Sequence, residues 1–375
     1  MSDFRKAWRF LKIYGVGRTL FKIAGRTRRR IPLPARSHGS QDIGLIGCGQ
    51  FGVATLGYFL IRRFGRRFRW VHDINPVAAG SAAKILGAKN VAENAEKILA
   101  DPKIGHVYIA SNHASHTVYA VAALEAGKMV YVEKPVSVSL AQFQRLDAAV
   151  RRAPGRIFVG YNRPFSKAIR ALRGVMGERP AGGLSLSCFV SGHVLAPDHW
   201  YRDPAEGTRI CGNAGHWIDL FVHVMAWRGV AEAYRIQLLP ADPAEADDNF
   251  ALSIATDRGD IFTLMLTARS EPFEGINETI NFQQDDVISK IDDFRRMTVW
   301  QGPRLRRWRF WPKDPGHKRA ALQPFDTGQS RDWEEIRLST LLMLRITEMV
   351  RTGVCETRLS RTEALAELDH EAETA

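Results

Sequence analysis

The chain has 375 residues, 45% hydrophobic and 25% charged, so it is long enough for two domains and has an ordinary globular composition. No apolar run approaches the roughly 18 residues of a membrane span, and no secretion signal is recognisable. The four cysteines lack CxxC spacing, which argues against a zinc ribbon or a disulfide framework. We therefore expect a cytoplasmic protein without a metal site.

The net charge of +13 is concentrated in residues 1–40, where eleven Lys and Arg face one acid, Asp3. This segment is predicted to be a basic amphipathic arm that ends in a linker at 37–41. Apolar side chains recur there at helical spacing: Phe4, Trp8, Leu11 and Tyr14, then Leu20, Phe21 and Ala24. Such an arm can dock on its own body or on a sister subunit, or it can lie on an anionic membrane surface. Because the charge is confined to this appendage, we expect no nucleic-acid partner.

A dinucleotide-binding motif follows the arm. A short buried strand is predicted at 43–46 and a helix at 51–63, and between them lies Gly47-Cys48-Gly49-Gln50-Phe51-Gly52. In such a turn the first glycine permits the bend, the second lets a pyrophosphate approach the backbone, and the third lets the helix pack on the strand. The predicted cofactor contacts are Gly47, Gly49, Gln50, Phe51 and Gly52.

Asp73 ends the second predicted strand, at 68–73, and lies 21 positions beyond Gly52. A carboxylate at about this spacing accepts both ribose hydroxyls and repels a 2′-phosphate. The next residues, 74–76, offer no cation to neutralise it, so the sequence favours NAD as the cofactor. An alternative and compatible role for Asp73 is the N-cap of a helix that begins near Pro76.

Strands and helices then alternate as far as Gly160, which predicts a doubly wound parallel sheet. The later strands and helices are less regular, which predicts an α+β domain with an open, largely antiparallel sheet. The predicted organisation is an arm and linker at 1–40, a Rossmann domain at 41–160, an α+β domain for substrate and oligomerisation at 161–350, and a polar tail at 351–375. Within the second domain, the basic aromatic stretch 295–319 is typical of a hairpin at an oligomer contact or a lid.

The chain resembles the glucose–fructose oxidoreductase/inositol dehydrogenase/MocA family. The segments that carry the resemblance are 107–113 with His116, 123–128, the Glu-Lys-Pro motif within 130–135, and 160–163. The resemblance covers about residues 42–350. It implies a Rossmann domain plus an open-sheet domain, sugar or cyclitol substrates, and a Glu-Lys-Pro lysine that helps to move the substrate proton. It also implies further cofactor contacts at Ser111, Asn112, His113, His116, Glu133, Lys134 and Asn162.

Oxidation of a secondary alcohol needs a base for the hydroxyl proton, and Lys134 is the predicted group. His216, in a His-x-Ile-Asp pattern, matches the family's catalytic histidine. Many members carry an aspartate four residues earlier, where this chain has Gly212, so we assign His216 mainly to orienting the reacting hydroxyl. His223 lies on the same helical face and is more simply a packing histidine.

Polar and aromatic residues between these motifs are predicted to bind substrate. They are Tyr161, Arg163, His199, Trp200, Tyr201, Arg202, Arg209, Asn213 and His216. The arginines, with Lys167, could hold a diphosphate. The sequence therefore predicts an oligomeric NAD-dependent oxidoreductase acting on a sugar, specifically a nucleotide sugar in polysaccharide or glycan synthesis. The alternatives are an NAD-dependent glycosidase of the same fold without net redox and a non-catalytic NAD-binding scaffold.

Overall fold

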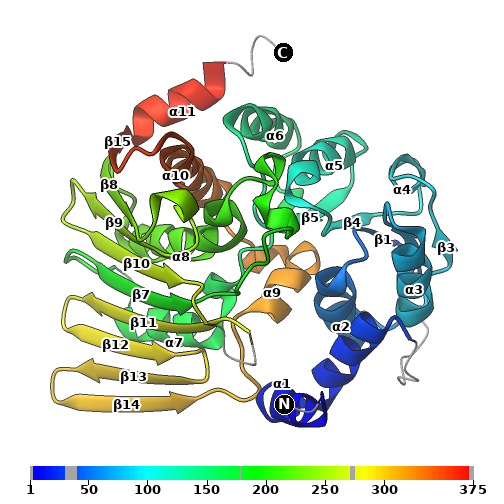
Figure 1. The fold of residues 1–375 in the computed structure, drawn as a ribbon, viewed down its shortest axis with the longest axis horizontal. Helices are drawn as coiled ribbons and strands as arrows, with labels where there is room; N and C mark the ends of the chain where they lie inside the picture. Colours follow the sequence, from blue (N-terminus) through cyan, green and yellow to red (C-terminus); the bar gives the residue numbers. More distant parts are fainter. Residues whose placement is uncertain (1–2, 30–39, 178, 271–274, 371–375) are drawn as a thin grey trace. The chain divides into compact units, whose positions relative to one another are not determined.

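The computed structural model describes residues 3–29, 40–177, 179–270 and 275–370 (Figure 1). The chain forms two compact units. The first comprises residues up to 137, 141–160 and 317–331, and the second comprises 138–140, 161–316 and 332–375. Residues 317–331, which the sequence-based division places in the second domain, thus belong to the first unit. Most of the predicted linker at 37–41 lies outside the described residues.

The first unit contains a six-stranded parallel sheet of order β3-β2-β1-β4-β5-β6. Its strands are β1 (Ile43–Ile46), β2 (Phe68–His72), β3 (Asn90–Val91), β4 (His106–Ile109), β5 (Met129–Val132) and β6 (Ile157–Val159). The order reverses between β1 and β4, which is the switch point of a doubly wound sheet. The predicted Rossmann-type sheet is therefore confirmed.

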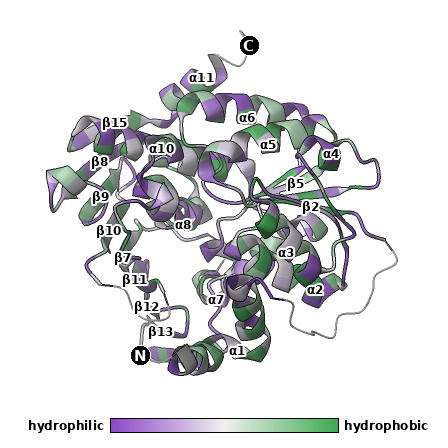
Figure 2. Ribbon diagram, turned by 45° about the vertical axis from the view of Figure 1, so that its right-hand side comes forward, coloured by the Kyte–Doolittle hydropathy of each residue, from purple (hydrophilic) through white to green (hydrophobic). Residues whose placement is uncertain are grey.

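The helices of this unit follow its strands. They are α2 (Tyr58–Phe64) after the π-helical turn Gly52–Gly57, α3 (Pro76–Leu86), α4 (Glu96–Leu99), α5 (His113–Glu125), α6 (Leu140–Arg152) and α9 (His317–Leu322). Figure 2 shows hydrophobic and hydrophilic residues interleaved along α6, as in an amphipathic helix. At α3, the Asn75 side chain caps the start and Gly87, with φ of 68°, ends the helix. Local chemistry thus sets the boundaries of this helix.

The arm forms helix α1 (Asp3–Thr27), which is broken at Gly15, where φ is 80°. Its second half docks on the first unit. Phe21 and Ala24 are buried in that unit's core, and the rings of Phe21 and Tyr58 lie 5.3 Å apart. Gly17 lies close to this contact, because a Cβ there would lie 3.0 Å from the Tyr58 hydroxyl, closer than ordinary van der Waals contact. Docking of the arm on its own body is therefore present in the structure.

The second unit contains a nine-stranded sheet of order β14-β13-β12-β11-β7-β10-β9-β8-β15. Its strands are β7 (Ser185–Ser191), β8 (Ala233–Pro240), β9 (Phe250–Thr256), β10 (Ile261–Thr267), β11 (Asn277–Gln284), β12 (Val287–Asp292), β13 (Arg296–Gln301), β14 (Arg304–Arg309) and β15 (Glu356–Ser360). Only β7 and β10 pair in parallel, and every other neighbouring pair is antiparallel. The predicted open, largely antiparallel sheet is confirmed.

Helices cover one side of this sheet, and buried residues alternate with exposed ones along most of its strands. The helices are α7 (Lys167–Met176), α8 (Gly215–Met225), α10 (Trp333–Thr352) and α11 (Arg361–His370). Helices α8 and α10 pack on each other, and α7 lies against β12 and β13. In the part of the chain that the structure describes, no helix is both long and apolar enough to cross a membrane.

The segment predicted as a polar tail, 351–375, contains ordered structure in its described part. β15 pairs antiparallel with β8, and α11 follows it. One buried side chain, Leu359, anchors this edge strand, while the other strand residues are polar. A polar edge strand of this kind has no apolar alternation for a sequence reading to detect.

Candidate active site

The three motif glycines meet different surroundings at the end of β1. Gly47 has φ of 91°, and a Cβ there would lie 2.3 Å from the carbonyl of Ala110. A Cβ at Gly52 would lie 2.5 Å from the Gly47 oxygen, whereas at Gly49 nothing lies within 4 Å. The first and third glycines are thus required by the fold, and the second leaves open backbone. This open backbone at the carboxyl end of a parallel sheet fits a pyrophosphate.

Asp73 follows β2 and is hydrogen-bonded to this loop. Its Oδ2 accepts from the Cys48 N–H at 2.7 Å, and its Oδ1 accepts from the Asn75 N–H at 2.9 Å. The N-cap of α3 is Asn75, which accepts from Val77 and Ala78, so the alternative capping role for Asp73 is wrong. Each carboxylate oxygen keeps a further acceptor position for a ribose hydroxyl.

Arg28, at the end of the arm, also contacts the glycine-rich loop. Its Nη1 donates to the Cys48 carbonyl at 2.9 Å and lies 3.5 Å from the Ser81 hydroxyl. Asp73 and Arg28 therefore hold the two polar backbone atoms of Cys48. No motif marks Arg28, because the fold of the arm alone brings it here.

The segment after β4 contains Ser111 and Asn112 and then the first turn of α5, with His113 and His116; these four residues are predicted cofactor contacts. Ser111 and Asn112 remain accessible, whereas His113 and His116 are buried. The two ring nitrogens of His116 lie 2.8 Å from the Pro135 carbonyl and 3.2 Å from the Ser111 carbonyl. Burial lowers the pKa of His116 to about 4, so the ring is neutral and donates one hydrogen bond. His116 thus joins the segment after β4 to the Glu-Lys-Pro segment and is engaged with protein atoms.

The Glu-Lys-Pro segment follows β5. The Tyr131 hydroxyl donates to Glu133 Oε1 at 2.6 Å, and the Lys134 N–H donates to Oε2 at 3.3 Å. Burial raises the pKa of Glu133 to about 7, although these partners oppose the shift. Gly160 makes room for the carboxylate, because a Cβ there would lie 2.6 Å from Oε1. Lys134 is half-buried, and its bond to Pro135 is cis.

In the second unit, His216 lies in the first turn of α8 and is nearly buried. The Tyr161 ring approaches it edge-on at 6.1 Å. The next residue, Trp217, donates from Nε1 to Glu278 at 2.8 Å. His223 lies further along α8, and its Nδ1 is 2.9 Å from the Glu335 carboxylate. Its ring thus has a partner within the protein, which agrees with the predicted packing role.

Glu278 of β11 is a buried anchor that the sequence reading missed. It accepts from Arg163 Nε at 3.3 Å and Nη2 at 3.1 Å, while the Arg163 guanidinium stacks on Trp217 at 4.7 Å. Asn162, a predicted cofactor contact, is fully buried; it donates to the Pro315 carbonyl and accepts from Arg163. Arg163 and Asn162 thus hold each other beside α8. An inward-facing acid in a strand has no sequence motif that would have identified it.

Arg209 is 1% exposed and is engaged on three sides. It donates to Asp248 at 2.8 Å, to the His193 carbonyl at 2.8 Å and to the Asn213 side chain at 3.4 Å. Arg202 also donates to Asp248, at 2.6 Å. Three of the four cations considered for a diphosphate therefore pair with buried acids, and Lys167 is the exposed one among the four.

His199, Trp200 and Tyr201 form one aromatic cluster. The Trp200 and Tyr201 rings lie edge to face at 4.3 Å, and His199 lies 5.1 Å from Tyr201. Tyr201 also covers Gly212, where a Cβ would lie 2.5 Å from the tyrosine ring carbon Cε2. The tyrosine ring thus occupies the space that an aspartate side chain at position 212 would need.

The predicted residues are therefore brought together in two groups, one in each unit. The first unit holds the glycine-rich loop, Asp73, the segment 111–116 and the Glu-Lys-Pro segment. The second holds Tyr161 to Arg163, the aromatic cluster, Arg209, Asn213 and His216. Within the described ranges, no group of three or more His, Cys, Asp or Glu side chains is arranged to hold a metal ion.

Comparison with known proteins matches the first unit most directly. A family model described as an oxidoreductase family with an NAD-binding Rossmann fold matches residues 42–161. Inositol 2-dehydrogenase of Ralstonia nicotianae is 31% identical over 171 residues, which cover 45% of this chain and 48% of that protein. Myo-inositol 2-dehydrogenase of Thermotoga maritima is 25% identical over 182 residues, covering 48% and 52%. The chain spans about half the length of these curated relatives.

Solved structures extend the likeness to both units. Levoglucosan dehydrogenase in complex with NADH and levoglucosan matches with a TM-score of 0.71 at 18% identity, covering 86% of this chain and 99% of that one. GenD2 from gentamicin A biosynthesis, in complex with NAD, matches with a TM-score of 0.70 at 17% identity, covering 88% and 100%. At these identities the likeness shows a shared fold. Residues 42–161 thus match the NAD-binding Rossmann domain of the glucose–fructose oxidoreductase/inositol dehydrogenase/MocA family of oxidoreductases.

Proposed function

We propose that this protein is an NAD-dependent dehydrogenase that oxidises a secondary alcohol of a sugar or polyol. The observation that carries the proposal is the arrangement in the first unit. Open backbone at Gly49, the Asp73 carboxylate after β2 and Lys134 after β5 all follow carboxyl ends of one parallel sheet. In such sheets, ligands bind at this edge. The inositol and levoglucosan dehydrogenases among its relatives suggest the polyhydroxy substrate class.

The chain's own residues have separable roles in this reaction. The glycine-rich loop and Asp73 bind the dinucleotide, which when bound supplies the hydride acceptor. Lys134 takes the hydroxyl proton on Nζ during oxidation and returns it in the reverse direction. Glu133 and Tyr131 fix the backbone beside Lys134, and His116 holds the same segment from the other side. The orienting role of His216, which lies in the second unit, stays a prediction of the sequence.

For the substrate, we propose an unphosphorylated polyhydroxy ring as the first choice. The cluster of His199, Trp200 and Tyr201 offers aromatic faces of the kind on which sugar rings stack. A nucleotide sugar, and with it a role in polysaccharide synthesis, has less support, because Arg163, Arg202 and Arg209 already pair with acids. A free diphosphate would have to compete with those carboxylates.

Product analysis tests the proposal. Incubation of the protein with NAD and a panel of inositols, anhydrosugars, aldoses and nucleotide sugars should yield free NADH together with a ketone or lactone product. Hydrolysis of a glycoside without NADH accumulation would indicate an NAD-dependent glycosidase. Tight NAD binding without turnover of any panel member would favour a scaffold protein.

We also propose that the protein self-associates through the exposed face of the nine-stranded sheet. Side chains of adjacent strands form an exposed row there: Leu305, Trp300, Ile288 and Ile261, with Gln283 and Ser185 between the last two. Met265 and Phe189 pair in a second exposed position. Exposed apolar patches of this kind mark protein interfaces. A cytoplasmic location stays a prediction of the sequence.

A further inference from the structure

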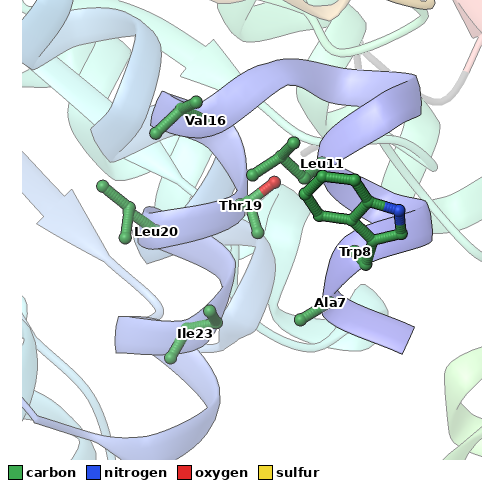
Figure 3. Close-up of a pocket in the computed structure, with 7 residues that line it drawn as sticks. All are labelled: Ala7, Trp8, Leu11, Val16, Thr19, Leu20 and Ile23. Atoms are coloured by element: carbon green, nitrogen blue, oxygen red, sulfur yellow. The ribbon is translucent and has the colours of Figure 1, made fainter. Parts of the chain in front are cut away.

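The arm has a second apolar surface that faces away from the core of the first unit. The break at Gly15 folds the two halves of α1 so that Ala7, Trp8 and Leu11 oppose Val16, Leu20 and Ile23 (Figure 3). Together with Thr19 they line a pocket of about 180 Å³. The Thr19 hydroxyl donates to the Gly15 carbonyl at 2.8 Å, so its hydrogen-bonding capacity is used within the helix. We call this surface, made of these seven residues, the arm pocket.

The arm pocket is open and is distinct from the docked face. Trp8 is 53% exposed and Val16 is 60% exposed, whereas Phe21 and Ala24 are buried in the core of the first unit. Trp8 and Val16 line one pocket on the outer face of a helix that is already docked by its inner face. An apolar ligand group is the partner that this surface fits.

The arm that carries the pocket is strongly basic, and Lys12 Nζ lies 5.3 Å from the centre of the Trp8 ring. Asp3 is the one acid among residues 1–40, against eleven Lys and Arg. Arg5, Arg9, Lys12 and Arg26 are exposed on the arm. Burial, and to a smaller extent the nearby charges of Arg26 and Arg18, lowers the pKa of Lys22 to about 8. The excess of positive charge on the arm complements an anionic ligand.

We propose that the arm pocket and the cations of the arm form a docking site for an anionic phospholipid surface. The aliphatic lining takes acyl chains, Trp8 lies at the interface, and the cations meet the phosphate headgroups. Nucleic acid would match the charge, yet it would leave Val16, Leu20 and Ile23 without an apolar partner. The enzyme would thereby work beside a membrane without a spanning segment.

Deleting the arm is a poor test, because it would also remove Phe21 and Ala24 from the core of the first unit. Point variants on the outer face avoid this problem. The apolar variant is Trp8→Ser with Val16→Ser, and its control is Val77→Ser with Val118→Ser, two exposed valines on other helices of the same unit. The charge variant is Arg9→Glu with Lys12→Glu, and its control is Lys84→Glu with Lys89→Glu, which are also exposed.

The measurement is co-sedimentation of the full chain with phosphatidylcholine vesicles, with and without phosphatidylglycerol. The wild type should bind the anionic vesicles in a salt-sensitive manner and leave the neutral vesicles unbound. Each arm variant should lose affinity by about tenfold or more, and both controls should bind like the wild type. An unchanged thermal midpoint and unchanged NAD affinity show that the variants are folded.

Several results would overturn the proposal. The first is that the wild type does not bind vesicles, and the second is that it binds both kinds of vesicle equally. The third is that the apolar variant binds as well as the wild type, which would show that charge alone makes the contact. A competition with duplex RNA covers the alternative ligand. If the RNA displaces the protein from vesicles and binds the apolar variant as tightly as it binds the wild type, the arm would be assigned to nucleic acid. A halved mass of the apolar variant in light scattering would assign the pocket to a second copy of the chain.

Discussion

At the scale of single residues, two oppositely charged side chains of the cofactor site form hydrogen bonds with the backbone of the same residue, Cys48. Asp73 accepts from the Cys48 N–H, and Arg28 donates to the Cys48 carbonyl. The first contact joins the glycine-rich loop to β2, and the second joins it to the arm. Asp73 therefore has two roles, one toward the ribose and one toward the loop, and its replacement affects both.

The double substitution Asp73→Ser with Ile74→Arg should shift the cofactor preference toward NADP by about tenfold or more. It removes a carboxylate that repels a 2′-phosphate and adds a charge-assisted donor at a fully accessible position. Affinity for NAD should also fall, because the Cys48 N–H loses its acceptor. Calorimetry with both nucleotides measures the change, and Val118→Arg with Val354→Arg, which also raises the net charge by two at exposed sites, is the control. Tighter NADP than NAD binding by the wild type would contradict the assignment.

Gly212→Asp should lower activity, although it introduces the residue that many family members carry. The new Cβ would collide with the Tyr201 ring at 2.5 Å and displace the aromatic cluster. KM should rise by several-fold, and Tyr201→Ala combined with Gly212→Asp should recover the thermal stability lost by the single variant. A Gly212→Asp enzyme with a higher kcat than the wild type would contradict this account. It would show that Tyr201 does not fill the space that an aspartate side chain at position 212 needs.

At the scale of elements, the sequence reading succeeded where local chemistry decides the structure. The glycine-rich turn, the residue after β2 and the Glu-Lys-Pro segment are each defined by short-range rules, because strand ends and turn glycines act within a few positions. The alternation of strands and helices in the first unit was predicted on the same grounds. The confirmed sheet classes follow from those element types and their order.

The reading failed where partners come from distant parts of the chain. Arg28 reaches Cys48, Glu278 reaches Arg163, and Tyr201 covers Gly212, and none of these contacts has a sequence spacing that predicts it. The same limit affected the arginines near the substrate loop. Their composition indicated a diphosphate, but the structure pairs Arg202 and Arg209 with Asp248. Charge in a sequence does not reveal which charges neutralise each other.

The Glu133 carboxyl should make the protein less stable as the pH rises from about 4.5 to about 7. Its pKa in the folded protein is raised to about 7, so the unfolded chain releases this proton first and is favoured across that interval. Glu133→Gln keeps an acceptor for the Tyr131 hydroxyl and removes the ionisation. Relative to the wild type, the variant should gain roughly 3 kcal/mol at pH 8 and little at pH 4.

Denaturant unfolding at a series of pH values measures this difference. Comparing wild type with variant cancels the contribution of titrating groups that do not interact with Glu133. A difference in unfolding free energy that stays constant from pH 4 to pH 8 would mean that the carboxyl is not perturbed in the folded state.

At the scale of the whole molecule, the exposed sheet face should decide the assembly. Ile288→Lys with Trp300→Glu places charges in the apolar row without touching buried side chains. If the row joins two copies, the mass by light scattering should fall to that of one chain at micromolar concentration. Val354→Lys, an exposed site before β15, is the control and should keep the wild-type mass. If the wild type is a monomer, the proposal that this sheet face is an interface would be wrong.

The most direct test of the proposed function is the turnover of Lys134→Ala. With a substrate identified by NADH release, kcat should fall by about 10²–10⁴-fold, because general acid–base catalysis contributes on that order. NAD affinity should stay within a few-fold of wild type, since the glycine-rich loop and Asp73 are intact. A variant that keeps most of its kcat with that substrate would contradict the account and would leave proton transfer to His216 or Tyr161.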